Sequence, residues 1–214
     1  MEKTITTLIY LHAFFGGIGL ITGIISFLSK KGDKQHRKLG KIFSYSMVIS
    51  SVISLAIARM PKHENLFLFL IGIFTIYLVL AGNRALTLKI KSKSDWIDKS
   101  VSGTMLIASF IMITIGIIGQ IQHIQNSILF LFFGGFGLFM SLKDFKTFRT
   151  FQENKNAWLI SHIGRMIGAL IASITAFLVV GLHIGSVFIW ISPTIIGTIY
   201  IIVWNRRIKK QNLF

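Results

Sequence analysis

One apolar run in this chain carries ionisable groups that are expensive to bury. The run Trp158–Leu182 is long enough to cross a bilayer, yet it contains His162 and Arg165. A guanidinium group within a membrane helix is costly, so it normally faces protein, water or a ligand. The two residues are three apart and therefore share one face of the predicted helix. This face is the first candidate for a binding site, and a planar guanidinium there suits a carboxylate or phosphate ligand.

A second group of candidate residues lies in the first two apolar runs. His12 is followed by Gly16 and Gly19, and His36 stands at the start of the second run. The glycines either open a slot for a flat ligand beside His12 or allow close helix packing around a hydrogen-bonded histidine. Both interpretations remain open. The candidate ligand-binding residues are therefore His162, Arg165, His12, Gly16, Gly19 and His36.

Paired histidines from different helices are also the axial ligands that membrane cytochromes use for haem b. The pairs would be His12 with His183 or His123, and His36 with His162. Their depths match poorly, because His183 lies near a helix end about 10 Å above His12 at 1.5 Å per residue. Haem b is thus an alternative cofactor, and no cofactor is favoured.

No acidic residue falls inside a predicted membrane span. The seven acids are Glu2, Asp33, Glu64, Asp95, Asp98, Asp144 and Glu153. Arg165 is therefore expected to be neutralised by backbone carbonyls, water, a lipid phosphate or a bound anion. The same pattern argues against a carboxylate proton relay and leaves His12 or His162 for any proton coupling. The absence of cysteine, and of two histidines four residues apart, disfavours an enzyme of the zinc hydrolase type, and no metal site is predicted.

The composition shows which elements must position these residues. The chain has 53% hydrophobic and 14% charged residues, whereas soluble domains have about 25% charged residues. We predict an all-α integral membrane protein, a single bundle over residues 1–214, with seven spans of roughly 17 to 25 residues. The predicted spans are Ile5–Leu28, Leu39–Ala58, Leu66–Ala85, Val101–Gln120, Ser127–Leu142, Trp158–Leu182 and Ser186–Trp204.

The basic residues are distributed unevenly between the two ends of these spans. Nineteen of the 23 Lys and Arg residues lie in the segments after the first, third, fifth and seventh spans. By the positive-inside rule the amino terminus is outside and the carboxyl terminus is cytoplasmic, in a bacterial inner membrane. Membrane topology and contact with anionic lipids explain the net charge of +16 without a nucleic-acid partner.

Two sequence matches predict an internal repeat. Phe14–Leu20 (FFGGIGL) matches Phe132–Leu138 (FFGGFGL) at six of seven positions, and Thr75–Tyr77 matches Thr198–Tyr200. The matched segments would run in the same membrane direction, as in a 3+1+3 parallel repeat. Repeat A would cover about residues 5–88, a linker helix about 99–122, and repeat B about 125–207.

The first sixty residues carry a resemblance to a known family. His12, Gly16 and Gly19 are followed by the His36-Arg37 pair and Gly40. This pattern resembles the bacterial membrane-protein family catalogued as domain of unknown function 2306. The resemblance implies a multipass fold and no established activity, so it supplies no catalytic role.

The residues favour transport or binding of a small anionic or polar solute within the bundle. The two alternatives are a redox protein that holds haem b and a structural or lipid-interacting membrane protein. The solute, its direction of movement and any coupling ion have no signal in the sequence.

Overall fold

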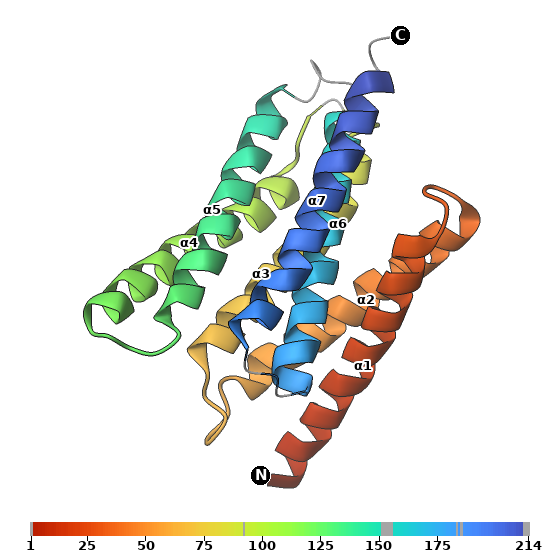
Figure 1. Ribbon diagram of the computed structural model, residues 1–214. Helices are drawn as coiled ribbons and strands as arrows, with labels where there is room; N and C mark the ends of the chain where they lie inside the picture. Colours follow the sequence, from red (N-terminus) through yellow and green to blue (C-terminus); the bar gives the residue numbers. More distant parts are fainter. Residues whose placement is uncertain (1, 92, 151–155, 183, 185, 212–214) are drawn as a thin grey trace.

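The computed structural model describes residues 2–91, 93–150, 156–182, 184 and 186–211. Every regular element in these residues is helical. The elements are α1 (Glu2–Leu28), α2 (Lys34–Ile57), α3 (Leu66–Thr87), α4 (Trp96–Ile121), α5 (Ser127–Thr150), α6 (Ala157–Ala176), the π-helical turn η1 (Phe177–Gly181) and α7 (Val187–Gln211). Successive α-helices run in opposite directions, and the chain ends lie at opposite ends of the bundle (Figure 1).

Within the described residues, six helices have the length and composition of membrane spans. They are α1 to α5 and the segment Ala157–Val179, which joins α6 to part of η1. The prediction of an all-helical multipass bundle is confirmed in this form. The α7 helix has 25 residues, but some of its side chains lie outside the described residues. A membrane crossing by α7 therefore stays a prediction.

Several helices extend beyond their apolar runs because polar caps set their ends. The Asp33 carboxylate accepts a hydrogen bond from the N–H of His36, so α2 begins before the predicted Leu39. Asp95 and Asp98 form a reciprocal capping box at the start of α4. Such caps satisfy the free N–H groups of a first helical turn, which can then lie outside the hydrocarbon.

The antiparallel helices α3 and α6 form the centre of the bundle. The α1/α2 hairpin packs beside them through α2 and α3, the α4/α5 hairpin packs through α4 and α3, and α7 lies on α6 (Figure 1). The core between these helices is apolar, apart from a few polar side chains. Its buried members include Phe43, Met47, Leu70, Phe74, Tyr77, Leu78, Met105, Met112, Ala169 and Leu170.

The two glycine motifs share a packing role, although the helices that they contact differ. A Cβ on Gly19 would lie 2.7 Å from the Met47 sulfur of α2, so this glycine allows α1 to approach α2 closely. A Cβ on Gly137 would lie 2.3 Å from the Met105 methyl of α4. A parallel repeat would place Gly137 against α6. The predicted 3+1+3 repeat is therefore not confirmed by the helix packing.

Candidate functional site

Arg165 points into the centre of the bundle from α6. Arg165 is only 3% exposed. It lies on the buried face of α6 that continues through Ala169 and Ala172. One terminal nitrogen, Nη2, donates to the backbone oxygen of Met140 on α5 at 2.8 Å. The buried position of the charge agrees with the reasoning from sequence.

The charge of Arg165 is balanced by a carboxylate within the bundle. Arg165 Nη2 lies 2.5 Å from Asp144 Oδ1, and Asp144 on α5 is 5% exposed. The other carboxylate oxygen accepts hydrogen bonds from the hydroxyls of Tyr77 at 2.5 Å and Ser102 at 3.0 Å. Arg165 Nε donates to the Tyr77 oxygen at 3.2 Å. These four residues, here called the Asp144 cluster, join α3, α4, α5 and α6.

The expectation that no acid accompanies Arg165 was wrong, because the fifth span continues beyond its apolar run. The predicted end was Leu142, whereas α5 extends to Thr150 and turns Asp144 inward. A signal in the sequence was available: Gly137, Ser141 and Asp144 have helical spacing and form one buried face of α5. Tyr77 and Ser102 had no comparable signal, since only the tertiary structure brings their helices to α5.

A second set of charged residues lies where α3 ends and α4 begins. The Arg84 guanidinium binds both oxygens of Asp95, at 2.6 and 2.7 Å, and its Nε lies 2.5 Å from Asp98 Oδ1. Lys91 completes this Arg84 cluster through a 2.5 Å contact with Asp95. The hydrogen bond from Lys91, followed by that from the backbone N–H of Asp98, holds the pKa of Asp95 well below its usual range.

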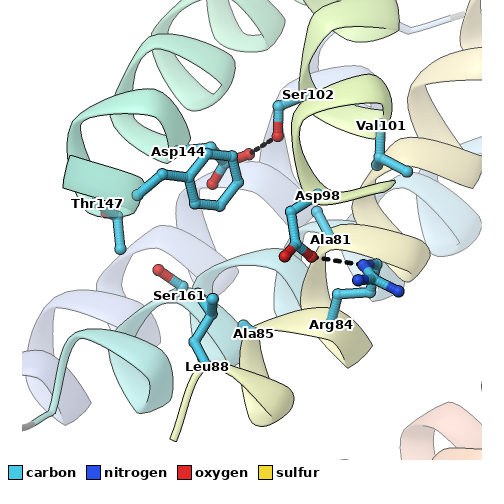
Figure 2. A pocket seen from close by; sticks show the side chains of 11 residues that line it. Ala81, Arg84, Ala85, Leu88, Asp98, Val101, Ser102, Asp144, Thr147 and Ser161 are labelled. Atoms are coloured by element: carbon cyan, nitrogen blue, oxygen red, sulfur yellow. Dashed lines mark hydrogen bonds and ion pairs between the residues drawn. The ribbon is translucent and has the colours of Figure 1, made fainter. Parts of the chain in front are cut away.

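A small cavity separates the two clusters. Figure 2 shows Asp144 and Ser102 on one side of it and Asp98 and Arg84 on the other. The cavity offers about 20 Å³ to water, which is enough for roughly one water molecule. It brings two carboxylates from different helices to one small space. The remaining lining residues are Ala81, Ala85, Leu88, Val101, Thr147, Phe148 and Ser161.

His162 lies near this site and faces α3. Its Nδ1 is 2.9 Å from the backbone oxygen of Gly82, and it does not line the cavity. A Cβ on Gly82 would lie 2.8 Å from the Met166 sulfur and 3.0 Å from Arg165 Cβ. The glycine therefore allows α3 and α6 to meet closely beside the Asp144 cluster.

His12 and His36 form two reciprocal contacts within the α1/α2 hairpin. His12 Nδ1 lies 3.0 Å from the Ser50 backbone oxygen, and the Ser50 hydroxyl donates to the His12 backbone oxygen at 3.0 Å. His36 and Ser26 repeat the arrangement, at 3.0 and 3.3 Å. The structure thus separates the predicted site residues, with His12, Gly16, Gly19 and His36 in the hairpin and His162 and Arg165 in the core.

The predicted haem pairs are only partly described. His183 lies outside the described residues, so its pairing with His12 stays a prediction. His36 and His162 both lie within the described residues. Since each ring binds a neighbouring helix through Nδ1, only Nε2 is left on each for a further partner.

No protein-family model matches the chain, and neither a curated protein nor a solved structure matches it. The resemblance to the family of unknown function stays a prediction. The helices themselves define the class: they are those of a multipass membrane protein built as an α-helical bundle.

Proposed function

We propose that this chain is a membrane transporter for a small polar solute, in which the Asp144–Arg165 ion pair acts as a gate. The observation that carries the proposal is the Asp144 cluster, a charge pair buried among four membrane-length helices. Ionisable residues at such positions are rare, and they characteristically mark substrate or ion pathways. The adjoining cavity connects this pair with the more exposed Arg84 cluster.

The helix packing supports a gating role for the ion pair. α5 packs mainly on α4, whereas α6 packs on α3 and α7, and α5 and α6 have few direct contacts among the described residues. Arg165 on α6 forms polar links to Asp144 and to the backbone oxygen of Met140 on α5. Loss of the ion pair would loosen the α4/α5 hairpin from α6, and two such arrangements are the kind of two-state element that transport requires.

The solute class follows from the charges around the cavity. Arg165 is already neutralised by Asp144, so it no longer favours a free anion. Two of the three charged lining residues are carboxylates, and the third, Arg84, is bound by Asp95 and Asp98. A neutral polar solute suits this lining better than an anion does.

The orientation is part of the proposal. The helix ends near residues 29–33 and 88–95 carry many basic residues, so we place this end, here called the basic end, in the cytoplasm against anionic lipids of a bacterial inner membrane. Reporter fusions after Asn205 should be cytoplasmic, and fusions near Gln122 should be external. The opposite result at either position would remove one crossing and overturn this orientation.

Exchange across a membrane tests transport without assuming a coupling ion. Liposomes that contain the purified protein would be preloaded with an unlabelled amino acid, amine, sugar or carboxylic acid and then given the labelled compound. We expect exchange of one polar class by the wild type and its loss in Asp144→Asn. Asp33→Asn is the matched control, because asparagine also caps a helix and Asp33 lies at the start of α2.

Two results would contradict the proposal. One is the absence of exchange for all four classes, and the other is equal exchange by the wild type and Asp144→Asn. Absorbance of the same purified protein addresses the haem alternative, since a Soret band would favour the redox class.

A further inference from the structure

We infer that the cavity between the two clusters is a proton path, in which a water molecule held between Asp98 and Asp144 delivers the proton that opens the ion-pair gate. This inference rests on the proposed transport function and names its coupling ion. It assigns Asp98 a role as a proton-transfer residue and Asp144 the role of the proton acceptor.

The cavity has the size and the polar lining that one water molecule requires. Its volume of about 20 Å³ exceeds the roughly 10–15 Å³ that a water needs, together with two to four polar partners. The Ser161 hydroxyl lines the cavity (Figure 2), and Ser161 is only 7% exposed. Within the described residues the Ser161 hydroxyl forms no hydrogen bond to the protein, so it is available to a water molecule in the cavity.

The charged groups around the cavity favour a proton over a metal ion. Asp144 faces Tyr77 of α3, Ser102 of α4 and Arg165 of α6. Asp98 faces Arg84 of α3 and accepts a hydrogen bond from the backbone N–H of Asp95. Each carboxylate is thus already paired with a guanidinium, so a metal cation would meet little net negative charge. A proton carried by water requires no additional coordination shell.

The Arg84 cluster connects the cavity with water at the basic end. The side chain of Asp98 is 2% exposed, whereas those of Arg84 and Asp95 are 23% and 35% exposed. Asp98 therefore lies between the partly exposed members of its cluster and the cavity. This is the position that a residue passing protons inward must occupy.

The proton transfer conserves atoms and charge. Asp98 takes a proton from water at the basic end and passes it to the cavity water, which gives one of its own protons to an Asp144 oxygen. Asp98 returns to a carboxylate, and Asp144 becomes a neutral carboxylic acid. Arg165 keeps its bonds to Tyr77 and Met140 but loses its charged partner. The link between α5 and α6 then loses its ion pair and keeps only hydrogen bonds from the Arg165 guanidinium to uncharged oxygens, which are weaker.

Infrared difference spectroscopy of the purified protein in lipid vesicles tests the path directly. After a rapid change from neutral to acidic pH, we expect a carboxylic-acid carbonyl band in the wild type that is missing in Asp144→Asn. In Asp98→Asn the band should reach its full amplitude but form roughly 10²-fold more slowly, because a proton-transfer group has been removed.

Two variants separate proton transfer from a structural effect. Arg84→Gln breaks the same ion pair as Asp98→Asn but keeps the Asp98 carboxylate, so its band should form faster than that of Asp98→Asn. Asp33→Asn should leave both the rate and the amplitude unchanged. Equal slowing in Arg84→Gln and Asp98→Asn, or a wild-type rate in Asp98→Asn, would overturn the path.

The spectra and the exchange assay can fail independently. If no band depends on Asp144, the proton is not the coupling ion, although solute exchange can still establish a transporter. If the bands behave as expected but no solute exchanges, the proton path stands and the transport function is lost.

Discussion

The buried ion pair predicts a strong energetic coupling between Asp144 and Arg165. Asp144→Asn leaves the guanidinium of Arg165 almost fully buried, at 3% exposure, without a counter-charge. The substitution also replaces the carboxylate that, in the wild type, accepts hydrogen bonds from Arg165, Tyr77 and Ser102. Removing one partner of a buried pair costs about 3–5 kcal/mol. The unfolding equilibrium constant is therefore expected to rise roughly 10²- to 10⁴-fold.

The double variant shows whether this loss of stability arises from the interaction between Asp144 and Arg165. Arg165→Gln alone leaves the Asp144 carboxylate unpaired and should have a similar cost. Asp144→Asn combined with Arg165→Gln leaves no uncompensated charge, and paired amides can still form hydrogen bonds. We expect the double variant to be more stable than the sum of the single losses predicts, by at least about 2 kcal/mol.

Equilibrium unfolding in mixed micelles with a denaturing detergent, followed by tryptophan fluorescence, measures all four proteins. Asp33→Asn is the control and should change the free energy of unfolding by less than about 0.5 kcal/mol, as is usual for surface substitutions. Strictly additive losses would refute the reasoning, because they would mean that the two side chains stabilise the bundle independently.

Two further predictions concern helix packing and pH. Gly116→Ala should lower stability by about 1–3 kcal/mol, because the new Cβ would lie 2.9 Å from the backbone nitrogen of Leu131. Gly103→Ala on the same helix is the control, because its Cβ would meet no atom within 4 Å, and it should be neutral or stabilising. Equal effects of the two substitutions in thermal unfolding would argue against close α4/α5 packing. Asp95→Asn should lower the unfolding midpoint at neutral pH. The pKa of Asp95 is depressed in the folded protein, so its stabilisation is present above the ordinary carboxylate pKa of about 4 and is lost as the pH falls through the folded value. The unfolding midpoints of the wild type and Asp95→Asn should therefore converge in strong acid. If a difference between the midpoints persists there, the stabilisation does not come from the charge of Asp95, which is paired mainly with Lys91.

The sequence by itself determined that this chain is a helical membrane protein with a charge buried in its sixth apolar run. Apolar runs of bilayer length leave few alternatives to helices, because unsatisfied backbone groups are too costly in hydrocarbon. The spacing of Gly16 and Gly19 predicted either a ligand slot or close helix packing, and in the structure Gly19 lets α1 approach α2 closely. These properties are local, so they can be read from composition and periodicity.

Only the tertiary structure decided which group neutralises Arg165. Asp144 lies beyond the predicted end of its span, and its inward position depends on how far α5 continues and which face it turns to α6. The hydroxyls of Tyr77 and Ser102 come from two other helices. The sequence therefore predicts that a buried charge needs a partner. The identity of that partner depends on contacts between helices that are distant along the chain.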